Sequence, residues 1–441
     1  MLPGYKGKFP VGLATFTKPI RPTQIYSNAR LGDKPVLKME EIAYAVYYPT
    51  TKEKAHSQGV HWVSRPLNAA TAGWAKFAGQ SYWLLWPFVY LLARFIKASF
   101  PTVPAYGDAV LKPPPKASEL DQSSASSETL VGSSGKWPLV IFSHGLAGGR
   151  YTYSDYCGRL AAQGMVVLAI EHRDGSGPMV APTDEETGKP VPKLYIQAKE
   201  LSWDNEPTTK LPIRKDQLKF RIREIYECFA SFKSIVDGDR GTTTSLGSFD
   251  HWDSLKGQVE CSKVFLTAHS FGGGTSLSLL SSPPPEGHAQ LPIEKVVLLD
   301  PWLEPLPLPG TLPIAYPDRP PLLIMNSEGF TLWKEHFEML EQLVADWRHQ
   351  KHECATLVTI VRSKHHFYSD FALFVPFGET KRLGMSVLNS AHKLTMAYFN
   401  GSLAEELKGK SGMEVEPVPG KDKYGEGKKQ IVGQPGELIV H

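Results

Sequence analysis

One serine of the chain lies in a glycine-rich turn that could present it as a nucleophile. The segment 268–274, Ala-His-Ser-Phe-Gly-Gly-Gly, follows the apolar run Val264–Thr267 and precedes a leucine-rich helical pattern. A strand, a sharp turn and a helix in this order are typical of a nucleophile elbow, whose GxSxG motif needs small residues two positions either side of the serine. Ala268 departs from glycine by one methyl group. The pattern predicts that Ser270 is a nucleophile, and an inert serine in a tight turn is the alternative.

A nucleophilic serine needs a base for its proton, and the base needs a carboxylate that fixes its tautomer. Behind a nucleophile elbow, the chain order is serine, acid and histidine, each at the end of a strand. Asp300 follows the apolar run Val296–Leu299, and the pair His365-His366 follows the run Leu357–Val361. Alone, each could cap a loop or form a satisfied polar pair, but their order favours Asp300 as the acid and one of the histidines as the base.

Hydrolysis through a serine also needs N–H donors for the oxyanion that develops on the substrate carbonyl. One donor would be the backbone N–H of Phe271, directly after the nucleophile. The second is expected from the loop after an earlier strand, which here is the glycine-rich segment Ser143–Arg150. Within this loop we predict the N–H of Leu146. A purely structural glycine turn is the alternative.

The elements that would position these residues alternate between strands and helices. Leu218 to Val236 carries apolar residues at helical spacing, and 36–48 predicts one or two flanking strands. Short apolar runs without polar alternation are typical of strands buried on both faces, as in a parallel sheet. These runs are Leu139–Phe142, Met165–Ile170, Val264–Thr267, Val296–Leu299, Leu322–Met325 and Leu357–Val361. We predict an α/β-hydrolase fold with a doubly wound, mostly parallel sheet.

A single domain with insertions would account for most of the 441 residues. We expect this domain to cover residues 1–400. It is interrupted by a flexible, serine-rich insertion at about 112–136 and an irregular insertion at about 177–213. From 401 to 441, glycine, lysine, glutamate and proline dominate, which predicts a poorly ordered tail.

Composition excludes several other classes of protein. The formal net charge of +3 is too small for a dedicated nucleic-acid binder. The four cysteines form no CxxC pair and no HExxH motif occurs, so we expect neither a metal site nor a cofactor. Met1 to Lys6 precede no apolar signal-peptide core, so we expect a cytoplasmic protein.

The most apolar stretch, Tyr82 to Ala93, could pack on the core or lie on a membrane. Its twelve residues fall short of the about 20 that span a bilayer, and Pro87 interrupts them. Apolar runs of this length most often pack on the core, which is the preferred interpretation. The alternative is a surface helix whose apolar side chains enter a membrane interface, namely Trp83, Leu84, Trp86 and Phe88.

Together, the motifs of the chain resemble the platelet-activating factor acetylhydrolase family, in its monomeric plasma and intracellular type. The similar stretches follow the family order and are Tyr47–Pro49, Phe142–Leu146, Glu171–Asp174, His269–Gly273, Leu299–Trp302, Asn326–Glu328 and His365–Phe371. The resemblance covers nearly the whole chain apart from the insertions and the tail. It implies calcium-independent hydrolysis, through an acyl-enzyme, of the short sn-2 acyl ester of a glycerophospholipid, acetyl or oxidatively truncated.

The resemblance also implies roles for single residues. Ser270 would be the nucleophile, Asp300 the acid and His365, rather than His366, the base. The remaining implied residues are Leu146 and Phe271 in the oxyanion hole, Trp302, His144 and Gly145 in a substrate pocket, and the stretch from Tyr82 at a lipid interface.

Departures from the family pattern leave the pocket size and the substrate open. They are Ala268, Pro301 and the two insertions. One alternative function is a broad short-chain carboxylesterase or polyester-type hydrolase that uses the same site. Another is a catalytically inactive lipid-binding protein, against which the complete set of candidate residues argues. The expected partners are a phospholipid substrate and a peripheral membrane surface. The sequence leaves the oligomeric state and any protein partner open.

Overall fold

Two compact units make up the structure, a computed structural model that describes residues 2–51, 57–84, 86–87, 102–115, 134–184, 187–307, 319–350, 354–374, 378–407, 412–421 and 427–441. The first unit comprises Met1–Val264 and Pro284–Pro292, and the second comprises Phe265–Pro283 and Ile293–His441. The chain first passes from one to the other inside strand β13 (Val259–His269) rather than through a linker. For this reason, we keep the single hydrolase domain as a proposal.

The strands of the first unit follow the order β7-β8-β4-β1-β6-β5. They are β1 (Val11–Ile25), β4 (Lys38–Pro49), β5 (Ser57–His61), β6 (Thr102–Gly107), β7 (Trp137–Ser143) and β8 (Val166–Glu171). β7 and β8 are parallel, whereas β4 lies antiparallel to both β8 and β1. β1 lies outside the predicted strands because Pro19 and Pro22 interrupt its apolar pattern.

Among its described residues, the first unit has three longer helices, namely α1 (Leu67–Phe77), α4 (Ser154–Ala162) and α5 (Pro212–Asp237). α5 contains the predicted stripe, which is buried from Leu218 to Val236, and it ends at Gly238 with φ 96°. The smaller elements are β2 (Ala29–Leu31), β3 (Lys34–Pro35), β9 (Met179–Val180), β10 (Lys193–Leu194), η2 (Ala198–Glu200), β11 (Ser202–Trp203), β12 (Thr244–Ser245) and η3 (Trp252–Ser254). Four of these lie in the insertion at 177–213, so that segment is not wholly irregular.

The strands of the second unit follow the order β13-β14-β15-β16-β19. β14 (Ile293–Leu299), β15 (Leu322–Ser327) and β16 (Ala355–Ile360) are parallel, and β19 (Leu438–Val440) is antiparallel to β16. All residues of β15 are buried, as expected for a parallel strand that is covered on both faces. β13 neighbours β14 in the sheet, and the N–H of Ser270 donates to the carbonyl of Leu299 (2.9 Å), so the residues after β13 and β14 come close together.

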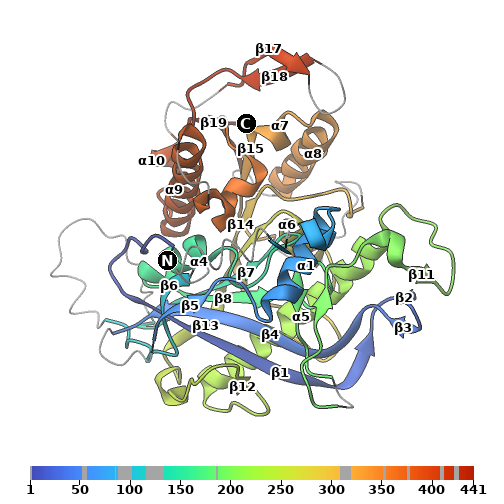
Figure 1. Cartoon of the computed structure of the whole chain (residues 1–441). Coiled ribbons are helices and arrows are strands. Elements are labelled where there is room, and N and C mark those ends of the chain that lie inside the picture. Colours follow the sequence, from blue (N-terminus) through green and yellow to red (C-terminus); the bar gives the residue numbers. More distant parts are fainter. Residues whose placement is uncertain are drawn as a thin grey trace. The chain divides into compact units, whose positions relative to one another are not determined.

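Helices cover both sides of this second sheet. In Figure 1, α8 (Lys334–Gln350) and α9 (Glu379–Asn400) lie on opposite sides of β15. The short elements α7 (Glu328–Thr331), η4 (His365–Tyr368) and η5 (Asp370–Leu373) follow β15 and β16, and α6 (Phe271–Leu280) follows β13. This alternation is the α/β-hydrolase architecture that the sequence predicts.

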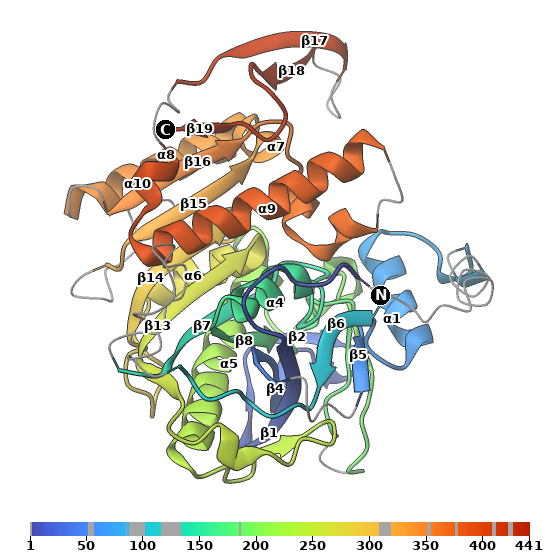
Figure 2. The same cartoon turned by 90° about the vertical axis from the view of Figure 1, so that its left-hand side faces the viewer.

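The tail after residue 401 contains regular structure, in contrast to the poor order expected. Its described residues form α10 (Leu403–Glu406), the hairpin of β17 (Val415–Lys421) and β18 (Gly427–Ile431), and β19. Figure 2 shows this hairpin at one end of the second unit, near β19. The apolar side chains of Ile431 and Ile439 are buried against Val361, and β19 pairs with the edge of the sheet. These buried contacts and this strand pairing give the tail regular structure, which its composition did not predict.

Part of the apolar stretch from Tyr82 is exposed. Leu85 and residues 88–101, which include Phe88, lie outside the described residues, as does most of the insertion at 112–136. Trp83 is 76% exposed and Leu84 73%, while the ring of Trp86 stacks on Tyr82 with centroids 5.7 Å apart. The preferred interpretation as a core helix is therefore wrong for Trp83 and Leu84. Among the helices of the described residues, none is both long and apolar enough to cross a bilayer.

Candidate active site

Ser270 occupies a strained turn between β13 and α6. Its backbone has φ 57° and ψ −121°, a conformation that non-glycine residues rarely adopt. The Ser270 N–H donates to the carbonyl of Leu299 (2.9 Å), and the Ser270 carbonyl accepts from the N–H groups of Gly273 and Trp302 (both 2.9 Å). Such a backbone conformation costs on the order of 1–3 kcal/mol and persists only where contacts with the surrounding structure hold it in place. Here, the hydrogen bonds of neighbouring elements hold the serine in the turn.

The glycines after Ser270 allow α6 to approach the segment that carries Asp300. A Cβ at Gly273 would lie 2.7 Å from the Cα of Pro301, and one at Gly274 would lie 2.6 Å from the carbonyl oxygen of Trp302. Both distances are too short for a side chain. Pro301, which departs from the family pattern, thus packs directly against the helix that follows the nucleophile.

Asp300 is a fully buried carboxylate with three hydrogen-bond donors. It follows β14 with φ 45°. Its Oδ1 accepts from the backbone N–H of Ser327 (2.5 Å), and its Oδ2 accepts from the Ser327 hydroxyl (2.5 Å) and from Nδ1 of His365 (2.9 Å). A buried charge is stable only when its lone pairs are satisfied in this way. The three donors therefore fix the orientation of the carboxylate.

His365 connects the buried carboxylate to the serine. Its Nε2 lies 2.9 Å from Ser270 Oγ, and its Nδ1 faces Asp300. Since a carboxylate accepts only, Nδ1 carries the proton of the neutral ring and Nε2 accepts from the serine hydroxyl. His366 is exposed and packs on Phe367 (ring centroids 4.8 Å apart). The structure thus brings His365, and not His366, between Ser270 and Asp300.

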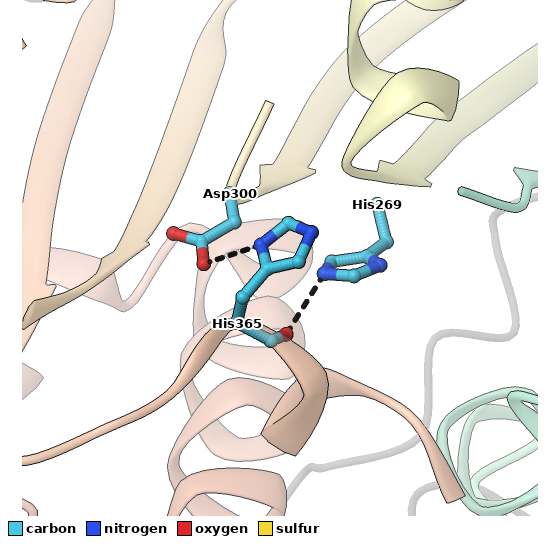
Figure 3. Close-up of side chains that lie close together, drawn as sticks. All are labelled: His269, Asp300 and His365. Carbon is cyan, nitrogen blue, oxygen red and sulfur yellow. Dashed lines mark hydrogen bonds and ion pairs between the residues drawn. The ribbon is translucent and has the colours of Figure 1, made fainter. Parts of the chain in front are cut away.

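His269, directly before the nucleophile, supports the segment that carries His365. Figure 3 shows its Nε2 pointing at the backbone carbonyl of His365, to which it donates across 3.1 Å. Burial lowers the pKa of His269 well below its usual value, and the adjacent His365 lowers it further. The ring is therefore neutral and holds a proton on Nε2. The motif contained His269, but nothing in its spacing indicated this contact.

One cluster of the described residues has the composition of a metal site. His269, Asp300 and His365 each offer a ligand atom, and these atoms lie within 4.8 Å of one another. However, Nδ1 of His365 is already hydrogen-bonded to Asp300, and Nε2 of His269 to the His365 carbonyl. A metal ion would have to displace both hydrogen bonds. The arrangement suits proton transfer from Ser270 better than metal coordination.

Further site residues escaped the sequence analysis because they act through contacts distant in the chain. Ser327 supplies two of the three donors to Asp300, and the ring of Phe330 lies flat against His365. His336 accepts a hydrogen bond at Nε2 from the N–H of Leu303 (3.1 Å), and burial lowers its pKa to about 4. Of these residues, only Ser327 could have been found from the sequence, since it ends a predicted strand region and lies in the stretch Asn326–Glu328 that resembles the family.

The predicted oxyanion loop lies in the first unit, between β7 and α4. Ala147 has φ 55°; its N–H donates to the Ser176 carbonyl (2.8 Å), and its carbonyl accepts from Nε1 of Trp74 (3.3 Å). These bonds hold the turn open at Leu146. Within the described residues, the N–H of Leu146 has no hydrogen-bond acceptor, so it can donate to a ligand.

His144 supports this loop from within. Its Nδ1 donates to the carbonyl of Gly145 (2.8 Å), and its Nε2 accepts from the N–H of His172 (3.1 Å). Burial, followed by the charge of Arg221, lowers the pKa of His144 to about 3. The guanidinium of Arg221 also donates to the His144 carbonyl (2.8 Å) and pairs with Asp174 (2.8 Å). With both ring nitrogens bonded inside the protein, His144 positions Gly145 rather than contacting a ligand through its ring.

The second unit also holds Phe271 and Trp302, whose rings lie 5.7 Å apart. Phe271 is the first residue of α6, where backbone N–H groups point out of the helix. The second unit thus contains Ser270, Asp300 and His365, one predicted oxyanion donor and one predicted pocket residue. Leu146, His144 and Gly145 belong to the first unit.

Residues 116–394 match the family described as platelet-activating factor acetylhydrolase, isoform II. The chain belongs to this family. Among curated proteins it is similar to a platelet-activating factor acetylhydrolase of Gallus gallus, at 29% identity over 54% of this chain and 53% of that protein. It is also similar to a putative phospholipase A2 of Schizosaccharomyces pombe, at 25% identity over 77% of this chain and 73% of that protein. The family is one of carboxylic ester hydrolases.

The fold is similar to that of a solved esterase. A ferulic acid esterase from Streptomyces cinnamoneus matches with a TM-score of 0.52 and 15% identity, over 98% of this chain and 99% of that one. At this identity the likeness establishes the α/β-hydrolase fold alone. The chain spans about half the length of the curated acetylhydrolases that it matches.

Proposed function

We propose that this chain is a serine-dependent esterase that hydrolyses the short sn-2 acyl ester of glycerophospholipids, acetyl or oxidatively truncated, without calcium. The observation that carries the proposal is the relay of 2.9 Å contacts from Ser270 through His365 to Asp300, behind a strained serine. Family membership and the names of the relatives, an acetylhydrolase and a putative phospholipase A2, support a phospholipid ester as the substrate.

In the acylation step, His365 Nε2 accepts the hydroxyl proton of Ser270 as Oγ attacks the ester carbonyl. Asp300 stabilises the imidazolium through Nδ1. The N–H of Phe271 donates to the oxyanion, and Trp302, whose ring centroid lies 5.7 Å from that of Phe271, borders the acyl group. The imidazolium then protonates the leaving alcohol of the glycerol backbone, which leaves an acyl-enzyme on Ser270.

In the deacylation step, water replaces the leaving alcohol. His365 accepts a proton from this water, which attacks the acyl-enzyme carbonyl, and the Phe271 N–H donates to the second oxyanion. Collapse of this intermediate returns the proton to Ser270 Oγ and releases the short acid. No step requires a metal-bound water or a metal-bound carbonyl.

We further propose that the exposed apolar side chains at the start of the stretch contact a lipid surface. Trp83 and Leu84 project from the first unit with about three quarters of each residue exposed. Amphipathic aromatic side chains of this kind favour the interface between lipid headgroups and acyl chains. Such contact would make membrane association peripheral.

Labelling with a fluorophosphonate tests the nucleophile. We expect stoichiometric labelling at Ser270, and loss of both label and esterase activity in Ser270→Ala. Ser278→Ala, which replaces another serine of α6 by alanine, is the matched control, and we expect it to be labelled like the parent. An active Ser270→Ala enzyme would refute the mechanism, and a folded parent that never labels would favour an inactive lipid-binding protein.

Substrate rates test the lipid class. We expect 2-acetyl phosphatidylcholine to be hydrolysed much faster than its 2-palmitoyl counterpart, equally with and without a calcium chelator. p-Nitrophenyl acetate, measured with and without vesicles, reports activity independent of a lipid. A preference for the nitrophenyl ester over every phospholipid would indicate a broad short-chain esterase instead.

Loss of vesicle binding in Trp83→Ala/Leu84→Ala would support the lipid-facing surface, and unchanged binding would contradict it.

A further inference from the structure

Phe330 contacts the face of the candidate base. Its ring lies parallel to the imidazole of His365, with centroids 4.3 Å apart and planes inclined by 1°. The two ring nitrogens of His365 are bonded in the plane of the ring, to Ser270 and Asp300. The faces of the imidazole are left for packing. An aromatic face carries negative electrostatic potential, and it attracts a cation within about 6 Å of its centroid.

We propose that Phe330 is a positioning residue that stabilises the His365 imidazolium formed when Ser270 gives up its proton. The inference rests on the proposed function, because the imidazolium arises only if His365 acts as the base. A neutral imidazole gains little from the aromatic face, whereas the cation gains more. The contact is thus stronger in the transition state than in the ground state, which is the condition for accelerating the reaction.

The short helix α7 fixes Phe330 to the segments on which the acid and the base depend. The N–H of Phe330 donates to Ser327 Oγ (3.4 Å), and Ser327 donates to Asp300. Glu328 accepts from the backbone N–H of Arg362 (2.6 Å), three residues before His365. The backbone that carries the aromatic ring is therefore held by residues that also contact Asp300 and the segment before His365.

The other groups around His365 differ from Phe330 in geometry or in charge. The ring of His269 also contacts His365, with centroids 4.5 Å apart, but it is tilted by 35° rather than parallel. Asp300 supplies negative charge in the plane of the ring. His269 from β13 and His336 from α8 are neutral, since burial lowers the pKa of each. His366 also has a lowered pKa, first through burial and then through Lys364 and His365. Among the described residues, further charged groups near His365 in the chain or in space include Lys364 and the ion pair of Glu328 with Arg362 (3.1 Å).

The test compares variants of the full chain by the pH dependence of kcat/KM on the acetyl substrate. Phe330→Leu removes the aromatic face and Phe330→Tyr keeps it. Phe265→Leu breaks another aromatic stack of the second unit, on Phe399 (4.1 Å), and controls for lost packing. Pentafluorophenylalanine at 330 keeps the shape of the ring but makes its face positive, so it tests the electrostatics if the leucine variant folds poorly.

We expect Phe330→Leu to lower kcat about two- to fivefold with little change in KM, and to move the acid limb of the profile about half a pH unit lower. The tyrosine and Phe265→Leu variants should keep the parental limb, and the fluorinated ring should shift it like leucine. An acid limb that moves higher would mean that Phe330 merely shields His365 from water. An unmoved limb would mean packing alone, and either result overturns the inference. If the parent is inactive, or Ser270→Ala is active, the proposed function fails instead.

Discussion

At the scale of single residues, the site depends on which nitrogen of His365 carries its proton. The acceptor-only carboxylate of Asp300 determines the tautomer, and the two donors from Ser327 hold that carboxylate in its orientation. The sequence indicated Asp300 and the histidine pair through their order along the chain. It could not choose between His365 and His366 by chemistry, since adjacent residues of one type differ only in where the backbone directs them.

Replacing the acid by its amide tests this tautomer argument. In Asp300→Asn, the amide N–H₂ can face His365, and the ring then no longer presents a free Nε2 lone pair to Ser270. We expect kcat to fall by roughly 10³- to 10⁴-fold. Phospholipid turnover by the purified variant checks this, with its thermal unfolding transition as the control for folding. More than a tenth of the parental kcat would contradict the role of Asp300.

At the scale of elements, the site depends on how closely α6 approaches the segment after β14. The run Gly272 to Gly274 indicated a sharp turn from the sequence alone. The same run also allows Gly273 to contact Pro301. The sequence could not predict this contact, because β14 and the loop before it separate the two residues in the chain. The sequence did not predict the role of α7 either, because the contacts at its start are with residues that follow β14 and β16.

A methyl group at Gly273 should disturb this contact. The added Cβ of Gly273→Ala would lie 2.7 Å from Pro301 Cα, so backbone must shift beside Asp300. We expect the free energy of unfolding to fall by about 1–3 kcal/mol, with loss of most of the activity. Urea unfolding measures the first effect. Gly329→Ala, whose added Cβ meets nothing within 4 Å, is the matched control and should unfold within about 0.5 kcal/mol of the parent.

At the scale of the whole molecule, both units bury uncharged histidines. Burial lowers the pKa of His144 to about 3 in the first unit and that of His336 to about 4 in the second. In the unfolded chain each titrates near 6.5. Between these values the unfolded state binds more protons than the folded state, so the free energy of unfolding rises with pH across this window and falls on acidification.

We therefore expect the protein to lose stability as the pH falls from about 6.5 towards 4. Each such histidine contributes a slope of up to roughly 1.4 kcal/mol per pH unit. Urea unfolding at pH 7, 6 and 5 gives this slope for the parent. His336→Gln should show a shallower slope, because it removes one of these titrations. His349→Gln, on the same helix near its end, is the control. A parental slope in His336→Gln would contradict the assignment of a buried neutral ring.

The sequence by itself determined the strand–turn–helix motif at Ser270, the order of serine, acid and histidine, and the α/β class. Each of these follows from local apolar runs and turn residues. The resemblance already implied His365 rather than His366. Only the tertiary structure showed the contacts of His365 with Ser270 and Asp300, the exposure of Trp83 and Leu84, the pairing of the tail through β19 and the stacking of Phe330 on His365. These outcomes depend on contacts between segments far apart in the chain, and local sequence patterns carry no information on such contacts.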